Sequence, residues 1–159
     1  MINLLENDIK LSCEEMDIWY RRFRDMVMYK GSSSPFDYLL WNGKKLVGIE
    51  AKMVNDKAKS TNFPFNRVSD DQREGLLDID KYTSSFGYLL INFRWLPHKG
   101  RTFAMPIKQF LQAEKDFNNG VMKDLYPRNT KSLPLEWFED ATEEIERLNK
   151  GWNLWKLLM

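Results

Sequence analysis

Two acids and one lysine lie in otherwise apolar stretches, where burial alone does not explain them. Asp37 stands between two aromatic residues, and Glu50 stands between two aliphatic residues with Lys52 two positions further on. Carboxylates brought close together repel each other unless a positive charge intervenes. A divalent cation removes that conflict, and a pair of oxygen ligands completed by several waters suits magnesium. We therefore expect Mg²⁺ to be held by Asp37 and Glu50.

Two predicted strands position these side chains. Residues 36–41 and 45–52 have the composition of short strands, and Asn42-Gly43 between them accepts the positive φ angles of a two-residue hairpin turn. Side chains alternate along a strand, so Glu50 and Lys52 point to one face of the sheet. A shared site further requires that Asp37 faces the same way.

A longer ordered set of residues surrounds this hairpin between Gly31 and Phe93. Its members are Ser32-Ser33-Ser34, Pro35-Phe36-Asp37, Glu50-Ala51-Lys52, Phe63-Pro64 and Gln72. The Asp and Glu-x-Lys elements resemble the PD-(D/E)xK nuclease pattern. In order and spacing the whole set resembles the RecU-type Holliday junction resolvases of bacteria and phages. The passage from Trp19 to Asp37 is shorter than the stalk of that family, which is a departure from it.

The resemblance implies an α/β fold with a restriction-endonuclease-like core, in which helices flank a mixed central β-sheet. It implies a Mg²⁺-dependent endonuclease, with Mn²⁺ as a substitute, that makes symmetric nicks in four-way DNA junctions during recombination and repair. It also implies a homodimer, since two symmetric nicks call for two sites related by a two-fold axis. The apolar face of the first helix and the Trp152/Trp155 tail are the candidate dimer surfaces.

The resemblance also assigns roles to individual residues. Asp37 and Glu50 bind the metal with the help of the Ala51 carbonyl, and Lys52 orients or deprotonates the water or offsets phosphate charge. Gln72 positions water or phosphate, although an ordinary polar surface residue is the alternative. Glu6 faces the metal from the first helix, and the alternative for it is an exposed acid at a helix start, which the macrodipole favours.

Positive charge is concentrated in two blocks although the formal net charge is only +1. Residues 21–67 hold ten Lys and Arg against four acids, and residues 94–131 hold eight against three. Basic blocks around an acidic centre suit a DNA backbone, and ordinary solvated surface is the alternative. The predicted DNA contacts are Arg21, Arg22, Arg24, Lys30, Ser33, Ser34, Lys57, Lys59 and Arg67.

Composition indicates one folded domain over residues 1–159, with a core at about 1–116 and a C-terminal helical segment at about 133–159. Hydrophobic residues make up 43% of the chain, and its one cysteine, Cys13, fits a reducing compartment. No secretory signal or membrane helix is visible. We expect a cytoplasmic protein of a bacterial or phage-infected cell.

Periodicity and turn signals predict the remaining elements. Helices are expected at residues 3–29, at 70–82 with Ser69 as the N-cap, at 106–116 and at 135–150. Strands are expected at residues 86–93 and 101–105. A polar loop is expected at residues 54–68, with Phe63 and Phe65 anchored in the core. His98 has no second His or Cys with which to bind zinc.

Two other functions stay open. One is a related nuclease that acts on linear duplex or replication ends. The other is a non-catalytic DNA-binding accessory protein of recombination, in which the acids serve structure only.

Overall fold

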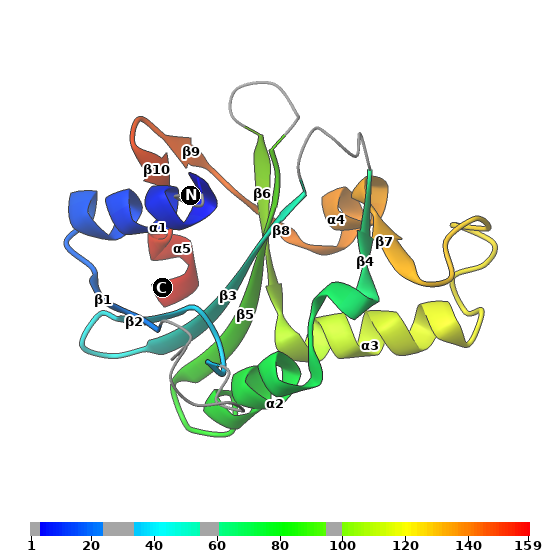
Figure 1. Cartoon of the computed structure of the whole chain (residues 1–159), viewed down its shortest axis with the longest axis horizontal. Coiled ribbons are helices and arrows are strands. Elements are labelled where there is room, and N and C mark those ends of the chain that lie inside the picture. Colours follow the sequence, from blue (N-terminus) through cyan, green and yellow to red (C-terminus); the bar gives the residue numbers. More distant parts are fainter. Residues whose placement is uncertain (1–3, 24–33, 55–60, 95–99) are drawn as a thin grey trace.

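A six-stranded mixed sheet forms the centre of the protein. The structure is a computed structural model that describes residues 4–23, 34–54, 61–94 and 100–159. The sheet has the strand order β1-β2-β3-β5-β6-β8, in which β3 and β5 are parallel and the other neighbours are antiparallel (Figure 1). Helices cover both faces, so the predicted α/β class with a mixed central sheet flanked by helices is confirmed.

The elements follow in chain order. They are α1 (Leu4–Glu15), β1 (Trp19–Arg22), β2 (Tyr38–Trp41), β3 (Leu46–Val54), β4 (Asn62–Pro64), η2 (Phe65–Arg67), α2 (Asp70–Ile79), β5 (Ser85–Phe93), β6 (Arg101–Pro106), α3 (Ile107–Asn118), β7 (Ser132–Pro134), α4 (Leu135–Ala141), β8 (Glu143–Ile145), β9 (Arg147–Leu148), β10 (Gly151–Trp152) and α5 (Trp155–Leu158).

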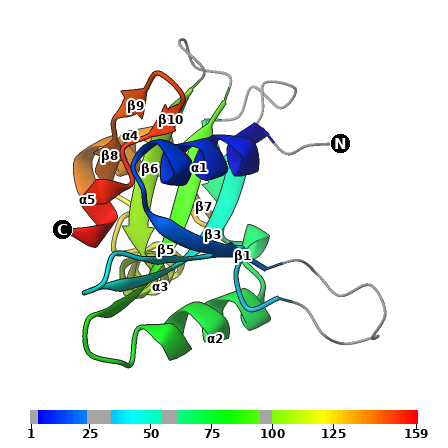
Figure 2. The same ribbon diagram turned by 90° about the vertical axis from the view of Figure 1, so that its left-hand side faces the viewer.

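Two apolar cores lie on opposite faces of the sheet. Figure 1 shows α1 and α2 on opposite sides of the strands, and in Figure 2 α1 crosses in front of them. The α1 face buries Leu5 and Ile9 against the strands, whereas the α2 face buries aromatic side chains of α3, α4 and β4. Strand β5 contributes to both cores, and its residues from Leu89 to Phe93 are all buried. This is the central strand that its continuous apolar sequence predicts.

The predicted helix over residues 3–29 is wrong beyond Glu15. The chain reverses at Asp17, which has a φ of 52°, and residues 19–22 then pair antiparallel with β2. Ser12 does not break the helix. Its hydroxyl donates to the Asp8 carbonyl at 2.6 Å and accepts from the backbone N–H of Trp152 at 2.7 Å, so it ties α1 to the C-terminal segment. Residues 24–29 of the predicted helix lie outside the described residues.

The hairpin that carries the acids has a longer turn than predicted. The β2–β3 register ends with Trp41 opposite Leu46, which leaves four residues in the connection instead of two. The Asn42 side chain accepts hydrogen bonds from the backbone N–H groups of Lys44 at 3.0 Å and Lys45 at 2.8 Å. Gly43 takes a φ of 89°. The Asn42 side chain thus closes the turn together with the backbone hydrogen bond from Asn42 N–H to the Lys45 carbonyl at 3.4 Å.

The predicted helix over residues 135–150 is wrong after Ala141. At Thr142 the backbone becomes extended, with φ −125° and ψ 170°, and residues 143–145 then pair with the β6 edge. The tail packs on its own chain, where Trp152 is 1% exposed. The apolar face of α1 is buried in the same core, so α1 and Trp152 do not offer the expected dimer surface, whereas Trp155 of the same tail is 38% exposed.

Smaller differences concern the other elements. Helix α2 begins at the residue after Ser69 as predicted but ends at Ile79. Phe63 and Phe65 are buried as predicted, yet they belong to β4 and η2 and not to a loop, and β4 pairs with β7. His98 lies outside the described residues. Among the helices that the structure describes, none combines the length and apolar character that crossing a membrane requires.

Candidate metal and nuclease site

Glu50, Lys52 and Gln72 meet on the α2 face of the sheet. Glu50 is 3% exposed, and its Oε1 lies 2.9 Å from Lys52 Nζ and 2.6 Å from Gln72 Nε2. Lys52 Nζ also donates to Gln72 Oε1 at 3.1 Å. Strand alternation places the two β3 side chains together, as predicted, and α2 brings the amide to them. The buried carboxylate is thereby hydrogen-bonded, as a charge at this depth requires.

Asp37 joins this cluster at the point where β2 stops pairing with β3. The ladder ends with Tyr38 opposite Ile49, and Asp37 N–H donates to the Ile49 carbonyl at 3.0 Å. The Asp37 carboxylate then accepts a hydrogen bond from the backbone N–H of Ala51 at 2.8 Å. In a longer ladder, the backbone carbonyl of a β2 residue would accept that bond. The positive charge of Lys52 acts on the Asp37 carboxylate, so Asp37 lies near the β3 side chains of the site.

The electrostatic setting of Asp37 favours an added positive charge. Burial is the largest influence and raises the pKa of Asp37, and the negative charge of Glu6 raises it further. The Ala51 hydrogen bond and the charges of Lys52 and Arg22 lower this pKa without cancelling the rise. A carboxylate that burial penalises in this way gains from a nearby cation.

Glu6 lies close enough to act on Asp37, but its carboxylate is engaged elsewhere. It forms an ion pair with Arg22 of β1, and its backbone carbonyl accepts from the Tyr38 hydroxyl at 3.2 Å. Helix α1 therefore places Glu6 at the border of the site, on the side away from α2. Arg22, predicted as a DNA contact, neutralises this acid.

Gln72 has two functions at once, because it is also the N3 residue of α2. The Ser69 hydroxyl accepts from Gln72 N–H at 3.3 Å, and Gln72 Oε1 accepts from Ser69 N–H at 3.0 Å, which completes a capping box. A single amide thus closes the helix start and contacts both Glu50 and Lys52. The cap fixes the rotamer of the side chain that reaches the site.

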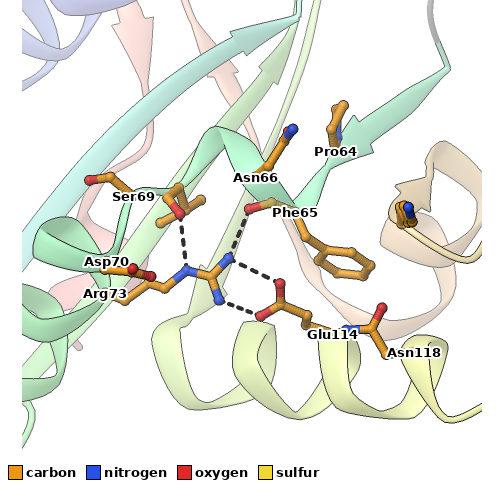
Figure 3. A pocket seen from close by; sticks show the side chains of 10 residues that line it. Pro64, Phe65, Asn66, Ser69, Asp70, Arg73, Glu114 and Asn118 are labelled. Atoms are coloured by element: carbon orange, nitrogen blue, oxygen red, sulfur yellow. Dashed lines mark hydrogen bonds and ion pairs between the residues drawn. The ribbon is translucent and has the colours of Figure 1, made fainter.

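An ion pair that the sequence analysis missed supports the start of α2. Arg73 binds both carboxylate oxygens of Glu114 on α3, and it donates to the carbonyls of Val68 at 3.0 Å and Phe65 at 2.9 Å (Figure 3). A pocket of about 610 Å³ opens beside it. No sequence signal points to this pair, because its members are 41 positions apart and only the fold joins them.

A close approach of backbone to backbone sets the distance between α2 and the Asp37 segment. A Cβ on Gly75 would lie 2.6 Å from the Pro35 carbonyl oxygen and 2.9 Å from its Cα. Only glycine therefore allows α2 to lie this near to the residues that precede β2.

The predicted DNA contacts have different environments. Arg21 is exposed on β1, whereas Arg67 donates to the Met53 carbonyl at 3.0 Å and lies 5.5 Å from the Phe63 ring. Burial lowers the pKa of Arg67. Ser34 is half-buried, two residues before Phe36. Five further predicted contacts lie outside the described residues, and these are Arg24, Lys30, Ser33, Lys57 and Lys59.

The oxygen donors of the site suit the expected magnesium ion. Within the four described stretches, no group of three or more His, Cys, Asp and Glu side chains is placed to hold a metal. The available oxygens are the two carboxylates of Asp37 and Glu50 and the Ala51 carbonyl. The carbonyl of Ala51 points to the same side of β3 as its N–H, which binds Asp37. The β2–β3 ladder has already ended there, so no β2 backbone group pairs with this carbonyl. Magnesium is commonly held by one or two carboxylates and retains several waters, so these hard oxygens fit it.

The fold of the chain is similar to those of solved structures, whereas its sequence has no such match. The sequence matches no protein-family model and no curated protein. The fold is similar to the 1.6 Å structure of Hjc, a Holliday junction resolvase from the archaeal hyperthermophile Archaeoglobus fulgidus. The match has 17% identity over 85% of this chain and 89% of that chain, with a TM-score of 0.49. Because this likeness concerns the fold alone, the function is argued from the side chains of the site.

Proposed function

We propose that the protein is a Mg²⁺-dependent endodeoxyribonuclease that nicks four-way DNA junctions, and so acts as a Holliday junction resolvase of the RecU type. The observation that carries this proposal is the meeting of Asp37, Glu50 and Lys52 where the β2–β3 ladder ends. Two carboxylates and an ammonium group at one place suit phosphodiester hydrolysis, in which a cation and a basic side chain share the phosphate charge.

Each residue has a defined task in this proposal. Asp37, Glu50 and the Ala51 carbonyl hold the cation, which when bound acidifies water and stabilises the charge that builds on the phosphate. Mn²⁺ substitutes for Mg²⁺. Lys52 orients the attacking water or offsets phosphate charge. The Gln72 amide holds Glu50 in its rotamer and adds no charge to an anionic centre.

A resolvase must cut two strands of the junction, so the proposal includes a homodimer with two-fold symmetry. Because the apolar face of α1 and Trp152 are buried within the chain, the dimer contact involves other surfaces, and the exposed Trp155 stays a candidate for it. A protein with this task acts on DNA in the cytoplasm of a bacterium or of its phage-infected host.

The test is a nicking assay on a fixed four-way junction and on linear duplex of the same sequence. With Mg²⁺ or Mn²⁺, the wild-type protein should nick the junction at paired positions and leave the duplex intact, and EDTA should stop the reaction. Asp37→Asn and Lys52→Ala should abolish nicking while junction binding is retained. Equal cleavage of both substrates would instead indicate a nuclease of linear duplex or replication ends.

One observation favours a second candidate, a non-catalytic DNA-binding accessory protein. Glu50 already has Lys52 and Gln72 as partners, so the cluster is a satisfied structural network even without an ion. A wild-type protein that binds junctions but nicks none with either metal would establish this candidate and exclude the nuclease.

A further inference from the structure

A second charged cluster lies on the α1 face of the sheet, away from Glu50. Asp8 Oδ2 of α1 accepts from Arg94 at 2.8 Å, just after β5, and from Arg147 of β9 at 3.1 Å. The Arg147 guanidinium also stacks on the Trp152 ring, 4.7 Å from its centre. The two guanidinium side chains are only 16% and 21% exposed. Both are therefore fixed in direction by their partners and by packing.

These residues line an open pocket of about 500 Å³, which we call the basic pocket. Its lining also includes Asn7, Asn149 and Lys150. Among the described lining residues, three cations face one carboxylate, which leaves a local charge of +2. Since Asp8 can offset only one of the three, the pocket favours an anion. Planar guanidinium groups and amide N–H groups are the donors that phosphate oxygens prefer.

The basic pocket and the proposed nuclease site border the same edge of the sheet. Arg94 N–H donates to the Val54 carbonyl at 2.9 Å, so the pocket adjoins the end of β3, the strand that carries Glu50 and Lys52. The register places Lys52 opposite Ile91, three residues before Arg94. At about 3.3 Å per residue, roughly 10 Å of strand separates them. Double-stranded DNA presents one phosphate charge per about 1.7 Å of its axis, so its phosphates recur often enough to match this separation along the strand. Because the two sites lie on opposite faces, DNA that contacts both passes around this end of the sheet.

We propose that the basic pocket binds a backbone phosphate of the DNA, several nucleotides away from the phosphate that is cut. This inference rests on the proposed function. Glu6 and Asp8 lie on opposite flanks of α1, whose buried stripe includes Leu5 and Ile9. Helix α1 thus separates the two sites, and a strand that crosses its N-terminal end contacts both. The pocket supplies affinity and orientation, whereas the chemistry remains at Asp37, Glu50 and Lys52.

The test uses two substitutions of unequal structural cost. Arg147→Gln removes a guanidinium that also contacts Asp8 and Trp152. Lys150→Gln changes an exposed side chain that forms no ion pair within the described part of the chain, and so it leaves the fold intact. Lys123→Gln is the matched control. It lies in the exposed segment after α3, at the opposite end of the long axis from α1 (Figure 1).

The dissociation constant for a four-way junction is measured without divalent metal at several KCl concentrations. We expect Arg147→Gln to weaken binding by roughly tenfold, since a charge-assisted contact is lost. Each pocket variant should reduce the salt dependence, the slope of log K against log salt, by about one. Nicking by the pocket variants at limiting protein should fall in step with their weaker binding, because less junction is bound. Lys123→Gln should match the wild type in every measurement.

The outcomes separate this inference from the proposed function. If the wild type nicks junctions but both pocket variants keep its affinity and salt slope, the inference is overturned and the nuclease stands. If the variants weaken binding in a protein that nicks nothing, the pocket is supported and the nuclease fails. Thermal unfolding with inorganic phosphate tests the other source of a phosphate group. Phosphate could stabilise the wild type but not Lys150→Gln, while the two proteins bind DNA equally well. That outcome would assign the pocket to a small phosphate and overturn the DNA assignment.

Discussion

The cluster around Glu50 and the cluster around Asp8 lie on opposite faces of one sheet and differ in the sign of their excess charge. Around Glu50, two carboxylates share the positive charge of Lys52. Around Asp8, one carboxylate is shared between Arg94 and Arg147. The first cluster therefore gains from a cation and the second from an anion. In the proposed complex with DNA, one face of the sheet would bind the metal ion and the other face would bind a phosphate.

The largest expected effect comes from Glu50→Gln, which removes the buried carboxylate of the acidic cluster. Under the proposed function Glu50 holds the cation, which supplies several kcal/mol of transition-state stabilisation, so the expected nicking rate is lower by about 10³-fold or more. Lys52 also loses its ion-pair partner, and breaking a buried pair costs about 3–5 kcal/mol. Single-turnover nicking and thermal unfolding measure the two effects. Glu139→Gln, in an exposed pair with Arg101, is the control and should change neither quantity appreciably.

Gln72→Ala and Ser69→Ala separate the two functions of the α2 N-terminus. Both lose part of the capping box, which costs about 1 kcal/mol of unfolding free energy. Only Gln72→Ala also loses the contacts to Glu50 and Lys52, and removal of a residue that orients a metal ligand lowers activity by about 10- to 100-fold. Urea unfolding and nicking rates are compared for the two variants. Equal losses of activity would mean that Gln72 serves the helix alone.

Gly75→Ala tests whether the spacing between α2 and the Asp37 segment matters. The new methyl group would overlap the Pro35 backbone, and such overpacking costs about 1–3 kcal/mol. Because Asp37 lies two residues after Pro35, nicking should fall with stability. Gly43→Ala is the matched control. It strains a positive φ in an open turn and should lower stability with little effect on the rate of the folded protein.

The smallest effect is expected at the exposed pair of Arg101 with Glu144. Hydrogen bonding from Arg101 lowers the pKa of Glu144 below its ordinary value of 4.5. A carboxyl group with a depressed folded-state pKa stabilises the fold above its unfolded pKa, and the contribution disappears as the pH falls through the folded value. Exposed pairs contribute about 0–1 kcal/mol. Glu144→Gln should therefore change thermal stability slightly at pH 7 and not at all at the acid end. A large loss at pH 7 would contradict this assignment.

The sequence predicted elements whose signals are local. Alternation placed Glu50 and Lys52 on one face, Ser69 marked the start of α2, and the continuous apolar run marked β5. It failed where a distant partner decided the backbone. Residues 19–22 fit a helical repeat but pair with β2. The predicted helix over residues 135–150 stops early, because residues 143–145 pair with β6. In both places the exposed edge of the sheet supplied hydrogen bonds that the periodicity of the sequence does not reveal.

By itself, the sequence determined which groups are available for chemistry at the hairpin and that two of them share a face, because alternation along a strand depends on backbone geometry alone. Only the tertiary structure decided that Asp37 meets Ala51 at the end of a ladder and that Gln72 reaches Glu50. It also decided that Arg94 and Arg147 converge on Asp8. These contacts join residues 14 to 139 positions apart, and strand pairing together with the packing of helices on a common sheet brings them together.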